Sequence, residues 1–360
     1  MGLDIGTDHV RAAHIKPASG GYALGNYGIS PMPLGAVVEG EVVDPDHVSA
    51  AIKDLWRHGG FKTKDVSIGL SNQKVVVRLI DLPYMEKAEL KGAIQYQAQD
   101  YIPIPVEEAV LDFQVLGDYM TPGDEHMMEV LLVAAQRDMV NNAVRAVEGA
   151  GLRLAQIDVT AFALVRSLLG STDTILPGEV EEGPGEATGI VHITSGLTNI
   201  VVVDRGVPRF VRVSSLAGNQ FTQAVATALN LTIDEAEALK NQVGLPAPDG
   251  QASVPLDDRT KAAQDALERE MTKFVAEVRR SLDYYLTQAT QSHVIRRILL
   301  SGSGAMLRHL PTHLERGLQT QVLIGDPLAR ISTNGSGEQL VISDRMGSAA
   351  AVGLAMGGVD

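Results

Sequence analysis

The chain has 360 residues, more than a single hydrophobic core usually serves, so we expect two lobes of α/β type. It carries 30 Lys and Arg against 44 Asp and Glu, and the resulting net charge of −14 opposes binding to a nucleic-acid backbone. The absence of cysteine excludes disulfides, thiolate metal sites and a cysteine nucleophile and, together with the lack of a long apolar run, predicts a cytoplasmic protein.

The first predicted element is a strand that turns back sharply, at the motif Gly-Leu-Asp-Ile-Gly-Thr of residues 2–7. Gly6 lets the backbone bend and approach a ligand closely, and the N–H groups of Gly6, Thr7 and Asp8 can surround an anion. Asp4 ends the strand, where its carboxylate is placed to hold a magnesium ion through water. The same residues also fit an ordinary tight hairpin with a buried Asp.

The rest of the first half alternates between the hydrophobic periods of strands and helices. Asp44 and Pro45 begin a helix that Gly59 and Gly60 end, and prolines break a second helix near residues 101–105. We expect helices at residues 45–59, 137–149 and 161–169, and strands at residues 10–15, 22–29, 66–70, 75–82, 110–116, 128–134 and 154–159. The acidic, Gly- and Pro-rich residues 176–185 predict a boundary between two halves.

The second half restarts like the first. Residues 190–203 are again an apolar strand, a small polar turn and an apolar strand. Two such hairpins, one opening each half, imply a duplicated fold with the ligand in the cleft between them. A third loop, at residues 301–304, has glycines that let the backbone lie close under a flat ligand such as adenine.

These motifs resemble the actin-like ATPase superfamily, which includes actin, DnaK-type chaperones, sugar kinases and FtsA, and within it the PilM family of type IV pilus assembly. Residues 96–108 and the motif Arg-Ser-Leu-Asp-Tyr-Tyr at 280–285 favour PilM over FtsA or a sugar kinase. Other similar segments follow in the family's order, at residues 133–138, 150–152, 216–219, 233–240 and 300–304. The resemblance implies an α/β, duplicated actin-like (ribonuclease H-like) fold, with two lobes around a nucleotide cleft and an inserted subdomain of the FtsA/PilM type.

The resemblance also implies domain boundaries. Lobe one would span residues 1–176, with an actin-like core at 1–74 and 158–176 and the inserted module at 75–157. Lobe two would span residues 187–360. Its phosphate and adenosine core would occupy 187–231 and 295–342, its helical cap 232–293, and a C-terminal helix at 343–360 would return to lobe one.

The resemblance assigns ATP and Mg²⁺ as cofactors. Asp4, Gly6 and Thr7 match the first phosphate loop, with Asp4 toward the metal, and Ser195, Gly196 and Thr198 lie in the second loop. The residues expected on the nucleoside side are Gly218, Glu237, Lys240, Gly302, Ser303 and Gly304. Thr232 and Glu235 form a capping box at the start of the helix that carries Glu237, so its charges also fit a solvated helix face.

The second loop departs from the family pattern, which begins Asp-x-Gly, because the matching residues are His192 and Thr194. A neutral imidazole does not replace a carboxylate toward magnesium. Phosphoryl transfer depends on positioned charge, so we expect nucleotide binding with slow or absent hydrolysis, and at most a slow ATPase. His192 on an apolar strand also fits a histidine that is satisfied inside the core.

Two classes of function remain open at this point. The PilM resemblance implies a cytoplasmic scaffold, peripheral to the inner membrane through its partners. It would bind the N-terminal cytoplasmic peptide of PilN at an edge strand or groove of the inserted module, and would contact the pilus motor ATPases. The alternatives are a sugar-kinase-like enzyme acting on a small metabolite, which needs a carboxylate base that the sequence does not show, and an FtsA-like division protein.

Overall fold

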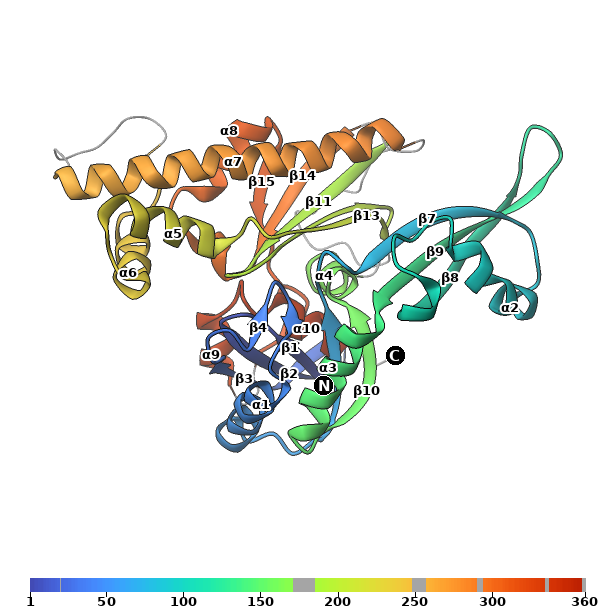
Figure 1. Cartoon of the computed structure of the whole chain (residues 1–360), viewed down its shortest axis with the longest axis horizontal. Coiled ribbons are helices and arrows are strands. Elements are labelled where there is room, and N and C mark those ends of the chain that lie inside the picture. Colours follow the sequence, from blue (N-terminus) through green and yellow to red (C-terminus); the bar gives the residue numbers. More distant parts are fainter. Residues whose placement is uncertain (20, 171–184, 248–256, 290–293, 334–336, 358–360) are drawn as a thin grey trace.

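Two large mixed sheets and a smaller antiparallel one make up the protein (Figure 1). The computed structural model describes residues 1–19, 21–170, 185–247, 257–289, 294–333 and 337–357. We call the first sheet with its helices lobe one, the second sheet with its helices lobe two, and the small sheet with its helix the inserted module.

The sheet of lobe one has six strands. Their order is β10 (Arg153–Val159), β6 (Asp65–Leu70), β1 (Gly2–Ile5), β2 (His9–Ala18), β3 (Gly21–Pro31) and β16 (Ile331–Ser332). One face packs against α1 (Pro45–Gly59) and α3 (Arg137–Gly149), and the other against α10 (Ala349–Met356) and α4 (Thr160–Leu168). A short hairpin of β4 (Val37–Val38) and β5 (Glu41–Val42) stands beside it.

The sheet of lobe two has five strands. Their order is β13 (Val207–Ser214), β12 (Thr198–Asp204), β11 (Glu186–Ile193), β14 (Val294–Ser301) and β15 (Gln321–Ile324). Its outer face is covered by α5 (Gly218–Leu229), α6 (Ile233–Val243), the long α7 (Asp258–Gln288) and α8 (Leu310–Leu318). Its inner face packs on α4, whose side chains share one apolar core with Ile190, Val201 and Val203. Helices α4 and α10 therefore lie at the junction of the two lobes.

The two lobes repeat one topology. In each, an antiparallel hairpin opens the sheet, β1 with β2 and β11 with β12, and the first strand also pairs in parallel with a later one, β6 or β14. The duplication expected from the two hairpins is therefore present in the strand order.

The inserted module projects from one side of lobe one (Figure 1). Its three antiparallel strands run in the order β7 (Val76–Pro83), β9 (His126–Gln136) and β8 (Ala109–Met120), and α2 (Lys87–Ala98) and η1 (Val106–Glu108) pack on one face. On the opposite face, side chains such as Val77 and Leu131 join the core that contains α4. The module is therefore held against the junction of the lobes.

The chain leaves lobe two earlier than the expected start of the C-terminal helix at residue 343. After η2 (Ser303–Met306), α8 and β15, the two-residue β16 already pairs with β3, and α9 (Glu338–Ser343) packs on β3. The C-terminal helix itself is α10, which begins only at Ala349. A two-residue strand leaves no periodic pattern, which is why the sequence did not show this return.

Candidate functional site

The first loop joins β1 to β2 and carries Asp4, Gly6 and Thr7. The N–H of Gly6 donates to the carbonyl oxygen of His9 (3.0 Å), which closes the turn. Asp4 is half-buried and lies in register with Arg11 on β2. Burial raises the pKa of Asp4 to about 6, even though the Arg11 guanidinium lowers it. A cation bound near Asp4 would therefore stabilise the ionised carboxylate.

The second loop joins β11 to β12. The Thr194 hydroxyl donates to the carbonyl oxygen of Leu197 (2.9 Å) and accepts from the Leu197 N–H (3.1 Å), so Thr194 closes this turn with its own side chain. Thr198 is fully buried, and its hydroxyl donates to the carbonyl oxygen of Leu216 (2.7 Å). Thr198 thus supports the loop from the strand behind it.

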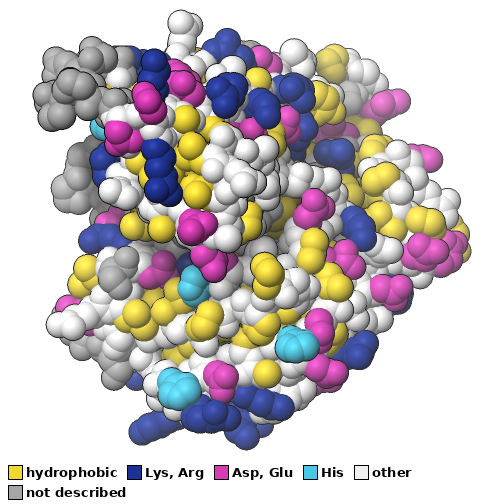
Figure 2. All heavy atoms as spheres, turned by 60° about the vertical axis from the view of Figure 1, so that its left-hand side comes forward, with side chains coloured by type: hydrophobic (Ala, Val, Ile, Leu, Met, Phe, Trp, Pro, Cys, Tyr) yellow, Lys and Arg dark blue, Asp and Glu magenta, His cyan; other side chains and the backbone are white. Residues whose placement is uncertain are grey.

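The structure brings the two loops into contact. Gly196 of the second loop packs on Thr7 of the first, since a Cβ on Gly196 would lie 2.3 Å from the Thr7 hydroxyl. Although burial raises the pKa of Asp8, its polar neighbours His9 and Ser195 and the charge of Arg11 hold it well below its ordinary value. Figure 2 views this side of the molecule and shows acidic side chains along the boundary between its upper and lower halves.

The glycines expected under a nucleoside surround the end of β11. Gly302 has a φ of 90°, and a Cβ there would lie 2.1 Å from the carbonyl oxygen of Ile193. Gly304 contacts the Ile193 side chain, and the N–H of Gly218 donates to the carbonyl oxygen of Thr194 (3.0 Å). With Ser303 at the start of η2, these residues converge on the second loop.

Glu237 and Lys240 lie one turn apart on α6. The Lys240 ammonium donates to Glu237 Oε2 (2.6 Å) and to the hydroxyl of Thr222 on α5 (2.9 Å). The Lys240 side chain is buried, whereas that of Glu237 is half-exposed. Burial raises the pKa of Glu237, but the hydrogen bonds from Lys240 and Thr222 outweigh it and keep the group ionised. The two residues join α6 to α5, the helix that begins beside the second loop.

The structure adds a buried cation that the sequence reasoning missed. Arg11 is 4% exposed, and its Nε donates to Asp344 Oδ2 (2.7 Å), which also accepts from the Tyr27 hydroxyl (2.7 Å). Arg11 thereby links the first loop to the segment before α10. Asp4 and Arg11 face each other in the predicted hairpin, and this could have indicated that Arg11 belongs to the site. The pairing with Asp344 could not be predicted, since Asp344 is far away in sequence.

His192 is a satisfied core histidine. It is 1% exposed, and its Nδ1 lies 2.7 Å from the Ser301 hydroxyl on β14. Burial, with a smaller contribution from the Arg11 charge, lowers the pKa of His192 to about 3. The imidazole is therefore neutral at physiological pH, and the strand that leads into the second loop supplies no carboxylate at this position.

Within the described ranges, no group of three or more His, Cys, Asp or Glu side chains is arranged to hold a metal ion. Asp4, the expected magnesium ligand, has Asp8, Asp344 and Arg11 nearby, so the local chemistry consists of hard carboxylate oxygens and one fixed cation. In the same ranges, no helix is both long and apolar enough to cross a membrane.

A groove of about 350 Å³ separates the inserted module from lobe one. Its walls are β8 and β10, each the last strand of its sheet, so alternate backbone N–H and C=O groups point away from the neighbouring strand. Apolar side chains line it, namely Val75, Leu131, Val133, Val140, Ile157 and Phe162. The sequence could not identify these residues, because an apolar groove and an apolar core give the same pattern.

A family model described as type IV pilus assembly protein PilM matches residues 2–359. Among solved structures, a PilM–PilN type IV pilus biogenesis complex is similar with a TM-score of 0.81 and 27% identity, covering 100% of this chain and 98% of that one. MreB5 of Spiroplasma citri bound to AMPPNP has a TM-score of 0.53 at 12% identity, covering 98% of this chain and 93% of its own, which shows the fold alone.

Among curated proteins, the cell division protein FtsA of Escherichia coli (strain K12) is 27% identical over 245 residues. This match covers 62% of the chain and 55% of FtsA, so the chain spans about half the length of the curated relatives that it matches. The family match extends over almost the whole chain, and the two-lobed actin-like fold agrees with it. The chain therefore belongs to the PilM family of type IV pilus assembly proteins.

Proposed function

We propose that this chain is an actin-like scaffold of type IV pilus assembly that binds the N-terminal cytoplasmic peptide of PilN. The observation that carries the proposal is the apolar groove between β8 and β10, found in a chain whose fold matches that of a PilM–PilN complex with a TM-score of 0.81. Family membership favours this scaffold over a metabolite kinase.

The groove suits an extended apolar peptide. An added strand can pair with the free edge of β8 or of β10 and place every second side chain on the apolar floor. Among the described residues of its lining, the carboxylates are those of Asp112 and Asp158, and Asp158 already pairs with Arg166. Backbone pairing with burial of apolar side chains, rather than charge, would therefore dominate the affinity.

Titration with a synthetic PilN-tail peptide tests this proposal. Val133 is half-buried in the groove, and Val133→Glu should weaken binding about tenfold or more, because a charge would replace apolar surface on the floor. The matched control is Val43→Glu, at an exposed valine outside the groove lining, which should bind like the unmodified protein. Equal binding by both variants, or no binding by the unmodified protein, would remove the groove from the proposal.

We also propose that the junction of the two lobes at the first and second loops binds ATP with Mg²⁺. The first and second loops, with Asp4, Gly6, Thr7, Ser195 and Gly196, would hold the phosphates, and Thr198 would support them from behind. Gly218, Glu237, Lys240, Gly302, Ser303 and Gly304 would hold the nucleoside. The hard oxygens around Asp4 fit such a ligand, and the metal would bring positive charge to the phosphates.

Hydrolysis would be slow or absent. His192 is neutral and buried, and the Thr194 hydroxyl is already hydrogen-bonded to the Leu197 backbone within its own turn. The second loop thus offers neither a carboxylate that orders metal and water nor a free hydroxyl at these two positions. The nucleotide would act on the angle between the lobes rather than as a substrate for turnover.

Attachment of the scaffold to the cytoplasmic side of the inner membrane would depend on its partners, PilN and, beyond it, the pilus motor ATPases. Fractionation checks this step: we expect the protein to sediment with membranes when PilN is present and to remain in the soluble fraction when the PilN tail is deleted. Membrane association without that tail would contradict it.

A further inference from the structure

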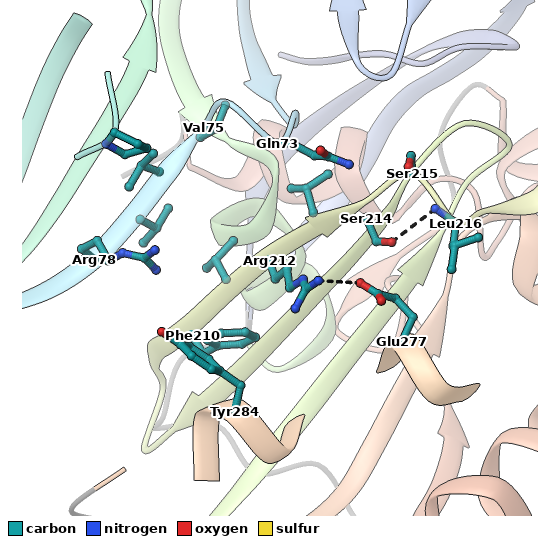
Figure 3. A pocket seen from close by; sticks show the side chains of 15 residues that line it. Gln73, Val75, Arg78, Phe210, Arg212, Ser214, Ser215, Leu216, Glu277 and Tyr284 are labelled. Atoms are coloured by element: carbon teal, nitrogen blue, oxygen red, sulfur yellow. Dashed lines mark hydrogen bonds and ion pairs between the residues drawn. The ribbon is translucent and has the colours of Figure 1, made fainter. Parts of the chain in front are cut away.

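A second slot lies on the other side of the inserted module, between β7 and lobe two (Figure 3). It has a volume of about 540 Å³, within the usual range of binding sites. Its lining comes from β7, from β13 and the turn after it, from α7, and from Pro103. It shares only Val75 with the lining of the groove at β8 and β10. The two depressions are therefore different surfaces.

Two edge strands border this slot. In the described part of the chain, β13 pairs with β12 and β7 pairs with β9, and each ends its own sheet. The two strands come close to each other but do not pair. Alternate backbone N–H and C=O groups of both strands therefore point toward the slot without a strand partner, which is the feature that captures extended peptides.

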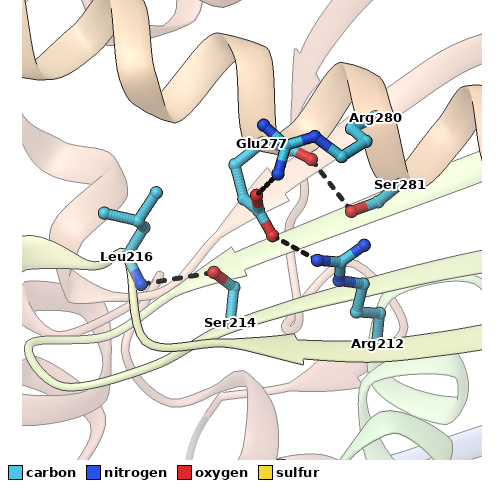
Figure 4. A network of polar contacts seen from close by, with 6 residues as sticks. All are labelled: Arg212, Ser214, Leu216, Glu277, Arg280 and Ser281. Atoms are coloured by element: carbon cyan, nitrogen blue, oxygen red, sulfur yellow. Dashed lines mark hydrogen bonds and ion pairs between the residues drawn. The ribbon is translucent and has the colours of Figure 1, made fainter.

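The side chains of the slot carry an excess of positive charge. Glu277 of α7 is 9% exposed and accepts hydrogen bonds from two arginines, from Arg212 Nη2 (2.7 Å) and from Arg280 Nη1 (3.0 Å) (Figure 4). Arg78 is exposed and, in the part of the chain that the structure describes, its side chain has neither a hydrogen bond nor an ion pair. Figure 3 shows Arg78 directed from β7 toward Arg212. The slot lining thus holds two arginines, Arg78 and Arg212, and one carboxylate, Glu277, whereas Arg280 binds that carboxylate from outside the lining.

The slot also offers apolar surface next to these charges. Phe210 of β13 lies against Tyr284 of α7, with ring centroids 6.1 Å apart, and Tyr284 is 47% exposed. Val75, just before β7, and Val77 of β7 form one wall. A ligand in the slot therefore meets backbone donors and acceptors, apolar and aromatic surface, and the unpaired charge of Arg78.

We propose that this slot binds an acidic, extended peptide segment of a partner protein, with its backbone along a free edge of β13 or β7 and its carboxylates toward Arg78 and Arg212. The excess of arginine selects for acidic side chains. The unpaired edges and the aromatic surface favour a peptide over a small anion. The site is independent of the PilN groove, so one protein can hold both peptides at once.

The probe is a capped octapeptide of alternating valine and glutamate, titrated at low salt in the presence of saturating PilN-tail peptide. We expect it to bind, to protect backbone amides of β13 or β7 from hydrogen exchange, and to lose affinity as salt is added. Arg78→Glu should lower its affinity about tenfold or more. Arg78 is exposed and unpaired, so this variant should melt at the same temperature as the unmodified protein.

The matched control is Arg57→Glu, at an exposed arginine of α1 outside the slot, which should leave the affinity unchanged. A lysine-containing octapeptide of the same pattern should bind at least tenfold more weakly. The proposal is overturned if the acidic peptide fails to bind, if Arg78→Glu and Arg57→Glu behave alike, or if the PilN-tail peptide displaces it. It is also overturned if inorganic phosphate binds as tightly and the peptide protects no strand amides.

Discussion

Gly302 turns the chain between β14 and η2 with a φ of 90°, a region that residues with a Cβ rarely occupy. A Cβ would also lie 2.1 Å from the carbonyl oxygen of Ile193, and the nearest atoms are all Ile193 backbone, which cannot move aside as a flexible side chain could. Gly302→Ala should therefore lower the free energy of unfolding by roughly 2 kcal/mol or more, measured in urea. Gly92→Ala, inside α2 with open space around it, should instead stabilise by about 0.5 to 1 kcal/mol. Equal stabilities would contradict both expectations.

His192 makes stability depend on pH in a predictable direction. Its pKa is about 3 in the folded protein and about 6.5 in the unfolded chain, so the unfolded state binds the proton first as the pH falls. The contribution that the neutral, buried His192 makes to the free energy of unfolding is fully present above pH 6.5. It is lost progressively as the pH falls from there toward 3. Between pH 7 and 5 the loss should be roughly 2 kcal/mol.

The measurement is the difference in unfolding free energy between the unmodified protein and His192→Gln, taken at several pH values. The subtraction cancels the pH dependence contributed by groups that both proteins share. Asp4 is one of these, and its raised pKa changes the stability in the opposite direction. We expect the difference to shrink by about 2 kcal/mol between pH 7 and 5. A difference that stays constant would show that His192 titrates in the folded protein as it does in the unfolded chain.

At the scale of elements, the ion pair of Arg11 and Asp344 fastens the segment before α10 to β2. Asp344→Ala would leave Arg11 buried without that partner and remove the acceptor of the Tyr27 hydroxyl. We expect a loss of roughly 3 kcal/mol in unfolding free energy. Replacing both partners, as Arg11→Met with Asp344→Leu, should recover much of this loss, since no unpaired charge remains.

The control for that prediction is Asp54→Ala, which removes an exposed pair with Arg57 on α1 and should cost less than about 1 kcal/mol. A loss of similar size from Asp344→Ala would mean that the buried pair contributes no more than a surface pair. The comparison therefore separates the role of burial from the role of charge.

Local signals predicted most of the elements because the residues that set their limits are neighbours in sequence. Asp44 accepts hydrogen bonds from the N–H groups of Asp46 and His47 (3.1 Å each), and Gly60 ends α1 with a φ of 66°. The Thr232 and Glu235 capping box begins α6 as expected. Strand limits differ by a few residues, as for β8, which continues to Met120 beyond the apolar pattern.

The site was less predictable, because its contacts join distant residues. The glycine motifs located all three loops, but the contacts of Gly196 with Thr7 and of Arg11 with Asp344 depend on the assembled lobes. The two grooves depend on which strands become sheet edges, and this follows from the pairing of whole elements. The order of strands in a sheet leaves no local pattern in the amino-acid sequence, so the edge strands could not be identified from it.

For the whole molecule, the inserted module is the part that borders both the apolar groove and the acidic-peptide slot and also contacts lobe two. Its β8 borders the apolar groove, its β7 borders the acidic-peptide slot, and Glu129 of β9 pairs with Arg209 of β13 (2.6 Å) in lobe two. The lobes also touch at the loops, through Gly196 and Thr7. A ligand that separates the loops would therefore move the surfaces that border both grooves.

This geometry bears on the proposed ATP site at the two loops. Fast hydrolysis needs a carboxylate placed to order metal and water. The strand that leads into the second loop instead carries His192, which is neutral and hydrogen-bonded to Ser301. We expect ATP turnover below about 1 per second, measured as phosphate release with Mg²⁺, while a fluorescent ATP analogue still binds. Asp4→Asn is the control: release that persists in this variant comes from a contaminant. Faster turnover that Asp4→Asn abolishes would mean that another residue supplies the missing carboxylate, and that the site turns ATP over rather than only responding to it.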